Sequence, residues 1–418
     1  MSAAHEGLTL PEAPPRRVEG PVRLLTFSSL YPSPGRPNHG VFVENRLRHL
    51  VGGGEAQSTV LAPVPWFPFR GGGAGQAEVI RHGLRVHHPR FVAPPGLGML
   101  TAPTSLYATA RAALARMLEQ GFDFDLLDAH YLYPDGVAAI WLGQEFGKPV
   151  VITARGSDVS QLPNYRLPRR AIQRAIKGAD ALIAVSGGLR DGLLALGAPA
   201  EKVTVLRNGV DLDLFMPPVP RQAARAALGM GPEPVLISVG HLIERKGHHH
   251  VVAALPMLPG HRLLILGEGP ERGALLALAR RLGVEDRVRL VGAQPHAYLP
   301  QWYGAADAMV LASSREGWAN VLLESMACGT PVVASPAWGS REAVRSPAAG
   351  LVMEETTPEA VAAGVQRLLA APPDRAATRA YAEGFGWEET SAGQMAVFRR
   401  VLAARAGTSG AVGARARA

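Results

Sequence analysis

The chain has 418 residues, 47% of them hydrophobic and 19% charged, which allows two or three domains and excludes a single small binding module. It has no run of about 18 uninterrupted apolar residues, and its single cysteine, Cys328, allows neither an intrachain disulfide nor a cysteine-built metal site, so we expect a soluble, cytoplasmic protein. A net charge of +8 can favour anionic partners such as phosphates or a lipid surface. It comes almost entirely from scattered arginines, which indicate coding bias at least as much as a binding surface, and no basic stripe interleaved with aromatic residues supports nucleic acid.

The first half of the chain alternates short apolar runs with stretches of helical apolar spacing. Residues 22–29 form a β-type run, a turn rich in proline and glycine follows as far as Gly40, and residues 41–50 have helical spacing. The pattern recurs, and further strands are expected at 58–62, 126–128, 149–153, 181–185 and 203–206. Strands that alternate with helices predict a parallel, doubly wound sheet.

A stiff proline-rich segment, Met216–Pro220, then indicates a linker between domains. A second series of strands is expected beyond it, at 234–240, 261–267, 288–291, 308–312 and 331–334. The predicted fold is therefore α/β, with domains at 21–213 and 214–385 and a ligand site in the cleft between them, at the carboxyl ends of the strands. The ends of the chain, 1–20 and 406–418, lack periodicity and are predicted to be disordered tails.

The most informative stretch is Ser313–Val333, in which a strand ends, a loop carries Glu316 and a helix begins. The first backbone N–H groups of that helix would form an anion site suited to a diphosphate. These groups belong to Asn320, Val321 and Leu322. Glu316 precedes the anion site and Glu324 lies about one helical turn beyond it. Two carboxylates that flank a phosphate cradle suit a nucleotide sugar, whereas the same pair alone would more often be solvated helix-edge charges.

These motifs resemble those of the retaining glycosyltransferases of family 4, which have the GT-B fold. The stretch EGWANVLLESMACGTPVVAS is similar to the Glu-x7-Glu signature of that family. Other segments match in family order, namely the Gly40 loop, Asp128–Gly136, Ala184–Gly188, Leu206–Asp211, Ser238–Gly247 and Leu266–Pro270. The resemblance spans about residues 22–400. It implies two Rossmann-like domains that face a central cleft, and a helix at 386–405 that crosses back to the N-terminal, acceptor-side domain.

The resemblance also implies roles for individual residues. Glu316 would hold the hydroxyls of the donor sugar, Glu324 would accept hydrogen bonds from ribose, and Lys246 would neutralise the diphosphate as its charge develops. His130 corresponds to the histidine beside the reacting sugar. Gly40 corresponds to the glycine whose backbone approaches the diphosphate.

The chain departs from the family pattern at two places. An arginine usually follows the glycine where this chain has His241, so either His241 or the nearby Arg245 would complete the phosphate clamp. Many relatives carry a His-Gly pair where this chain has Arg155 and, three residues later, Asp158. Both side chains are expected on the acceptor side of the cleft.

The activity that the resemblance implies is that of a retaining hexosyltransferase. It would move a sugar from a nucleotide donor to a hydroxyl of a glycan or lipid-linked acceptor, in polysaccharide or glycolipid biosynthesis. No metal or other cofactor is expected, because the catalytic loop has no Asp-x-Asp pair and no Cys/His cluster has ligand spacing. The alternatives are a GT-B nucleotide-sugar epimerase, a glycan phosphorylase and a catalytically silent partner subunit.

Two segments are candidates for contact with the inner face of a membrane. Residues 166–177 are predicted to form a basic amphipathic helix, and residues 96–117 a moderately apolar helix that follows a Gly/Pro loop. Basic amphipathic helices can lie on anionic lipid, although most of them are solvated faces. Many relatives act on lipid-linked acceptors, which favours a peripheral membrane protein.

Overall fold

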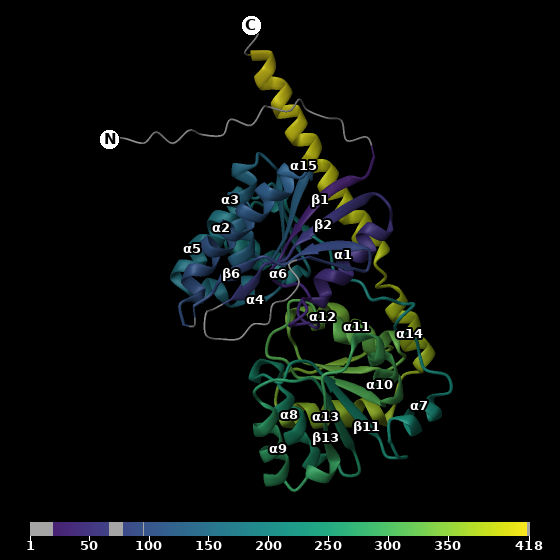
Figure 1. Ribbon diagram of the computed structural model, residues 1–418. Coiled ribbons are helices and arrows are strands. Elements are labelled where there is room, and N and C mark those ends of the chain that lie inside the picture. The colour runs from purple at the N-terminus through teal and green to yellow at the C-terminus, as the bar shows by residue number, and fades with distance from the viewer. Residues whose placement is uncertain (1–19, 67–77, 95, 416–418) are drawn as a thin grey trace.

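The protein is described here by a computed structural model that covers residues 20–66, 78–94 and 96–415, with side chains described as far as residue 407. The tail predicted at 1–20 lies outside the described residues except for Gly20. Figure 1 shows two α/β domains, the first above and the second below, with the C-terminal helix running back along the first. Two domains with parallel sheets confirm the predicted fold class. No helix in the described part of the chain is long and apolar enough to cross a membrane.

The first domain is built on an eight-stranded sheet of order β10-β9-β8-β7-β1-β2-β5-β4. Its strands are β1 (Val22–Phe27), β2 (Ala56–Leu61), β4 (Glu78–Arg81), β5 (Leu84–His87), β7 (Leu126–His130), β8 (Val150–Ala154), β9 (Ala181–Ala184) and β10 (Val203–Val205). All neighbours are parallel except β4, which is antiparallel to β5. A separate parallel pair is formed by β3 (Val64–Trp66) and β6 (Arg90–Val92).

The second domain has a six-stranded parallel sheet of order β13-β12-β11-β14-β15-β16. Its strands are β11 (Val235–Val239), β12 (Arg262–Leu266), β13 (Val288–Gly292), β14 (Ala308–Leu311), β15 (Val332–Ala334) and β16 (Gly350–Val352). In both sheets the chain order reverses at the first strand, so a crevice opens at the carboxyl ends of the strands on either side of it. Every residue of β8 and of β11 is buried, because helices cover both faces of these sheets.

Helices of both domains pack on the faces of the sheets (Figure 1). Those of the first domain are α1 (Val41–Gly52), α2 (Gly98–Glu119), α3 (Val137–Glu145), α4 (Ser157–Ser160), α5 (Arg166–Gly178) and α6 (Gly187–Ala195). Those of the second are α7 (Arg221–Ala227), α8 (His248–Ala254), α9 (Arg272–Arg281), α10 (Leu299–Ala305), α11 (Asn320–Ala327), α12 (Trp338–Ala343), α13 (Pro358–Ala370) and α14 (Arg375–Glu383).

The last helix, α15 (Glu388–Arg415), leaves the second domain and packs on α1 of the first. Phe398 and Val401 are buried there in one apolar cluster with Val43 and Leu47. The helix continues to Arg415, past residue 405, where the sequence pattern placed its end and the start of a tail. Alanine and arginine, both strong helix formers, outnumber glycine in residues 403–415, which accounts for the extension. Residues 416–418 lie outside the described chain.

Candidate active site in the interdomain cleft

Glu316 and Lys246 meet in the cleft although 70 residues separate them in sequence. Glu316 lies in the loop between β14 and α11, and Lys246 ends a short turn of helix that follows β11. Lys246 Nζ donates to Glu316 Oε1 at 2.6 Å, and the two side chains are only 17% and 9% exposed. Each of the two groups expected to bind the donor therefore neutralises the charge of the other.

Glu324 lies on the second turn of α11 and is held by two side chains of the same domain. Tyr303 Oη donates to Glu324 Oε2 at 2.9 Å, and His296 Nε2 lies 3.3 Å from Oε1. Burial by itself lowers the pKa of His296, but the hydrogen bond and the charge of Glu324 outweigh it and raise that pKa. Phe215 packs edge-on against His296 with ring centroids 5.1 Å apart, so the carboxylate has a fixed orientation toward the cleft.

The start of α11 lies between these two glutamates. No side chain caps the helix, and Asn320 and Val321 are partly exposed, whereas Leu322 is buried. The Leu322 N–H donates to the Ala319 carbonyl at 3.0 Å, so it does not point free into the cleft as predicted. The predicted anion site is therefore reduced to the N–H groups of the first two residues of the helix.

The two candidates for a second phosphate cation have different surroundings. Arg245 Nη1 donates to the Arg315 carbonyl at 3.0 Å, so its guanidinium braces the loop that carries Glu316. His241 is exposed, and its Nδ1 lies 3.4 Å from the Glu268 carbonyl at the limit of a hydrogen bond. Of the two side chains, His241 is consequently held more weakly by other residues.

His130 is the last residue of β7 and is 1% exposed. Arg155 Nη2 lies 2.7 Å from its Nδ1, and Asp128 Oδ2 lies 3.2 Å from its Nε2. Because a guanidinium can only donate, Nδ1 must accept, which leaves the ring proton on Nε2 facing Asp128. Burial lowers the pKa of His130, consistent with a neutral ring. Burial also lowers the pKa of Arg155 to about 9.

The structure differs from the prediction for Asp158 and gives another reason for Gly40. Asp158 is fully buried, and its carboxylate accepts backbone N–H groups of Leu132, Arg155 and Gly156, so it shapes this loop instead of facing an acceptor. Gly40 has φ 73°, and a Cβ there would lie 2.2 Å from the Leu30 carbonyl oxygen. Glycine is therefore required at position 40 by the turn itself, whatever binds beside it.

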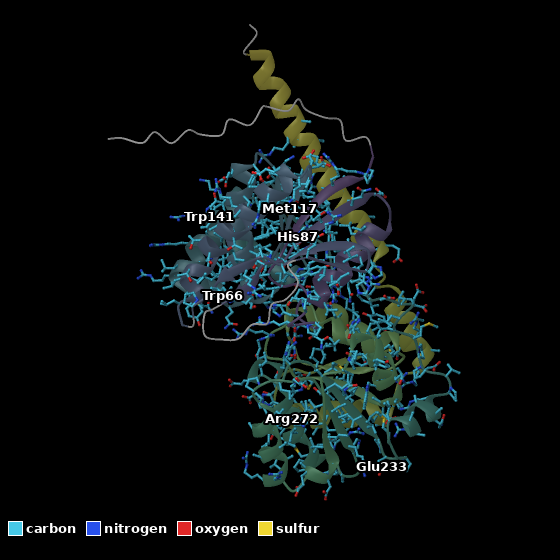
Figure 2. The ribbon with its side chains drawn as sticks, in the orientation of Figure 1. Trp66, His87, Met117, Trp141, Glu233 and Arg272 are labelled. Atoms are coloured by element: carbon cyan, nitrogen blue, oxygen red, sulfur yellow. The ribbon has the colours of Figure 1, made fainter. Side chains whose placement is uncertain are left out.

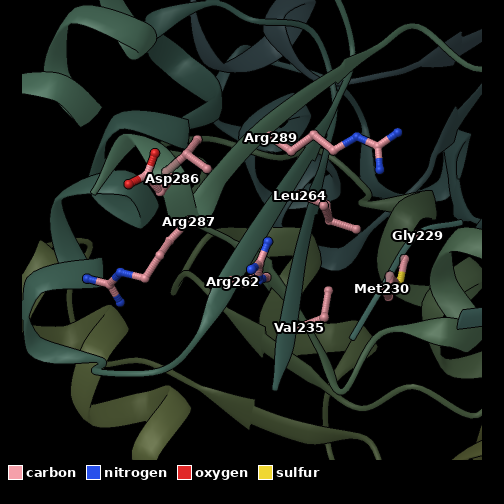
Figure 3. A pocket seen from close by; sticks show the side chains of 9 residues that line it. Gly229, Met230, Val235, Arg262, Leu264, Asp286, Arg287 and Arg289 are labelled. Carbon is pink, nitrogen blue, oxygen red and sulfur yellow. The ribbon is translucent and has the colours of Figure 1, made fainter. Parts of the chain in front are cut away.

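Two cavities are relevant to the choice of site. One lies in the cleft and is lined by Phe42, Asn45, Gly209, Val210, Asp211, Phe215, His296, Asn320, Glu324 and Trp387. A larger one lies at the amino ends of β11, β12 and β13, at the end of the second domain away from the cleft (Figure 3). Its arginines are already bound, since Arg262 pairs with Glu233 and Arg287 donates to carbonyls of 255, 258 and 261. The side chains that line the cleft cavity therefore suit a ligand better than those that line the larger cavity.

Among the residues that the structure describes, no three His, Cys, Asp or Glu side chains are grouped so that they could hold a metal ion.

Several partners in the cleft were not predicted. His296, Tyr303, Asn208 and Trp318 all take part in its hydrogen bonds. Asn208 lies in the matched segment Leu206–Asp211, but nothing in the local pattern indicates its partners.

Comparison with known families gives two matches that together span both domains. The profile described as "Glycosyl transferases group 1" matches residues 220–385, and "Glycosyltransferase Family 4" matches residues 41–214. The D-inositol 3-phosphate glycosyltransferase of Segniliparus rotundus is 34% identical over 349 residues, which cover 77% of this chain and 76% of that protein. The enzyme of the same name from Thermobispora bispora is 34% identical over 309 residues, which cover 67% and 71% of the two chains.

Solved structures match over nearly the whole chain. Sucrose-phosphate synthase from Thermosynechococcus elongatus superposes with a TM-score of 0.77 at 23% identity, covering 92% of this chain and all of the other. Anabaena HepE in complex with UDP gives a TM-score of 0.72 at 21% identity, covering 91% and 100%. The likeness confirms the GT-B arrangement of two Rossmann-like domains.

Proposed function

From the premise that this chain belongs to the group 1 glycosyltransferases, we propose that it transfers a sugar with retention of configuration and without a metal ion. The chain is a hexosyltransferase that moves a sugar from a nucleotide donor to an acceptor in glycan biosynthesis. The observation that carries the finer proposal is the Lys246–Glu316 pair beside the start of α11, with Glu324 on the same helix. Together these groups offer a cation, helix N–H groups and two carboxylates to one diphosphate sugar.

In the proposed reaction the acceptor hydroxyl attacks the anomeric carbon on the face from which the diphosphate departs. The bond from that carbon to the β-phosphate oxygen breaks, the bond to the acceptor oxygen forms, and the acceptor proton passes to the leaving phosphate. Lys246 Nζ and the first N–H groups of α11 stabilise the charge that builds up on the phosphate. Glu316 holds the sugar hydroxyls, so that the reacting atoms are oriented without an enzyme nucleophile.

A donor with a uridine base is the first to test, because the GT-B structure of Anabaena HepE holds UDP. A thermal-shift screen of UDP, GDP and ADP and of their glucose conjugates identifies the base, since a ligand that binds only the folded state raises its stability. Incubation of the preferred donor with phosphorylated polyols and lipid-linked sugars then tests transfer. Relatives named for D-inositol 3-phosphate favour the phosphorylated class. Proton NMR of the product gives its anomeric configuration, and inversion would overturn the proposed mechanism.

The two alternative enzyme activities have distinct products. An epimerase would release free sugar without an acceptor, and a phosphorylase would need inorganic phosphate. A silent partner subunit would bind no donor, although Lys246, Glu316 and Glu324 are all present. Failure of every nucleotide to shift the melting temperature would favour that last alternative and refute the proposed function.

We also propose that the first domain docks on an anionic lipid surface beside the cleft. Five cations lie on the exposed side of α5, which contains no acidic residue, and none has an ion-pair partner among the residues described; they are Arg166, Arg169, Arg170, Arg174 and Lys177. Exposed apolar side chains lie at the starts of α2 and α5, two helices that contact each other, namely Leu97, Met99, Leu100, Tyr165 and Leu167. Trp66 lies on the edge of the first domain nearest the second (Figure 2). Apolar side chains ringed by cations suit a lipid interface.

Co-sedimentation with vesicles tests this surface. Binding to phosphatidylglycerol vesicles should exceed binding to phosphatidylcholine vesicles and should fall with salt. Arg169→Glu with Arg170→Glu should abolish the difference, whereas Arg116→Glu, on an exposed position near the other end of α2, should leave it unchanged. Equal binding to both vesicle types would refute the lipid proposal without affecting the transferase.

A further inference from the structure

Asn208 joins the two domains by hydrogen bonds from both ends of its side chain. It follows β10, is 4% exposed, and its Oδ1 accepts from Arg46 Nη1 at 3.1 Å and from Arg155 Nη1 at 3.0 Å. Its Nδ2 donates to Oδ1 of Asn320, the first residue of α11, at 3.2 Å. Its carbonyl accepts from Trp318 Nε1 at 3.0 Å. Two of these partners belong to the first domain and two to the donor-side loop of the second.

The first-domain side of this junction is a ring of buried polar contacts that includes the cleft histidine. Its neighbours are joined by hydrogen bonds to Arg46 or Arg155 or through Gln394, except that His130 and Asp128 are joined by a polar contact of 3.2 Å. The guanidinium of Arg155 contacts both Asn208 and Nδ1 of His130. The other ring nitrogen of His130 faces Asp128. Gln394 of α15 donates to Asp128 at 3.5 Å and accepts from Arg46 Nε at 2.7 Å. The ring therefore runs through Asn208, Arg155, His130, Asp128, Gln394 and Arg46. Displacement of any member shifts the others, because buried polar groups without partners are costly.

The backbones of the two domains also touch beside this junction. A Cβ on Gly317 would lie 2.4 Å from the Arg155 carbonyl oxygen, so the loop that carries Glu316 lies directly on the loop that carries Arg155. At this separation of the two loops, the side chain of Asn208 reaches Asn320 of the second domain by a direct hydrogen bond. The contact sets a fixed distance between the donor cradle and the first domain.

We propose that Asn208 is a positioning residue that holds the start of α11 in register with the His130 face of the first domain when the cleft is closed. The proposal rests on the transferase function, since it assigns the donor to α11. An amide suits this place because it accepts from two guanidinium groups at one end and donates at the other. Aspartate would satisfy Arg46 and Arg155 but could not donate to Asn320, and an apolar residue would leave both arginines without an acceptor.

Asn208→Asp keeps the acceptor for the arginines and removes the donor to Asn320. Because the Asn320 amide can turn and donate to the new carboxylate, Asn320→Ala is the decisive variant. Asn320→Ala removes the same hydrogen bond from the other side. Glu342→Gln is the matched control, because Glu342 of α12 also bridges the domains, to Arg207 at 2.5 Å and to the Gly188 N–H at 3.2 Å, outside the ring. Three measurements apply, namely hydrolysis of UDP-glucose with water as acceptor, calorimetric affinity for UDP, and hydrogen exchange of backbone amides 318–324.

Asn208→Asp should lower the kcat of hydrolysis by about tenfold or more, as expected for the loss of one buried hydrogen bond, and change UDP affinity by less than about threefold. Asn320→Ala should do the same, and the double variant should be no worse than either single one. Exchange of amides 318–324 should rise in both variants and stay unchanged in Glu342→Gln. A purely structural role would lower the melting temperature without this split.

Normal exchange of amides 318–324 and normal turnover in Asn320→Ala would overturn the proposal, as would strictly additive effects in the double variant. Asn320→Ala decides the matter if Asn208→Asp fails to fold, because the same hydrogen bond is lost. The exchange measurement needs no donor. If the wild-type chain neither binds UDP nor hydrolyses UDP-glucose, the uridine donor is refuted. The exchange comparison would still test the role of Asn208.

Discussion

Replacing Glu316 by glutamine should strengthen the binding of a bare nucleoside diphosphate while it weakens turnover. Lys246 is paired with Glu316 at 2.6 Å, so an incoming diphosphate must displace a carboxylate before it can engage the cation. A charge-assisted hydrogen bond contributes about 1.5–3 kcal/mol. Because about 1.4 kcal/mol is a factor of ten, Glu316→Gln should bind UDP about tenfold more tightly than the wild type.

Turnover should change in the opposite direction. Glu316 is proposed to hold the sugar hydroxyls as charge develops at the anomeric carbon, and one preorganised electrostatic group contributes about 10²-fold to kcat. The variant should therefore combine tighter UDP binding with about a hundredfold lower kcat. Tighter UDP binding together with a lower kcat distinguishes direct competition for Lys246 from a general disruption of the site.

Titration calorimetry with UDP measures the first effect, and two variants serve as controls. Glu268→Gln removes an exposed carboxylate from the same edge of the sheet without touching Lys246, so it isolates the general effect of one negative charge. Glu324→Gln should weaken UDP about tenfold, because its carboxylate is proposed to accept from the ribose. Unchanged or weaker UDP binding by Glu316→Gln, or equal tightening by Glu268→Gln, would refute the reasoning.

Three further predictions concern the same site and the stability of the second domain. Lys246→Ala should lower kcat/KM by about 10²-fold, and near-normal turnover would transfer its role to Arg245 or His241. Activity should survive excess EDTA, whereas loss that magnesium or manganese restores would contradict metal-independent transfer. Burial lowers the pKa of His248 from 6.5 to about 4. The unfolded chain therefore binds the extra proton first, and the free energy of unfolding should fall by up to about 3 kcal/mol between pH 6.5 and 4. Urea titrations of wild type and His248→Gln check this, and parallel pH profiles would contradict it.

Much of the fold could be predicted because the central strands of parallel sheets are continuous apolar runs. Residues 149–153 and 234–240 show that pattern, and β8 and β11 lie there, buried at every position. The strand β4 was missed, since Glu78–Arg81 is half-exposed at the edge of its sheet and its composition carries no strong signal. The end of α15 was also misplaced, because the glycines in that segment indicated a tail.

The site was predictable only as far as short-range pattern and family resemblance reach. The glutamates of α11 and its loop stand out because one nine-residue motif, from Glu316 to Glu324, carries both. Nothing local pairs Lys246 with Glu316, or Tyr303 with Glu324, because these contacts depend on how distant loops meet at the sheet edge. The ring around Asn208 draws its members from α1, β7, α15 and the loops that follow β8 and β10, so it exists only once the last helix has crossed back to the first domain.

A crystal structure with UDP-glucose bound is the most direct test of the proposed donor site. The account predicts that the diphosphate lies at the start of α11, within hydrogen-bond distance of Lys246 Nζ and of the Asn320 and Val321 N–H groups. It also predicts that the Lys246–Glu316 pair is broken, that Glu316 contacts sugar hydroxyls and that Glu324 contacts the ribose. A nucleotide bound elsewhere, for example among the arginines of the far cavity in Figure 3, or one bound with the Lys246–Glu316 pair intact, would contradict it.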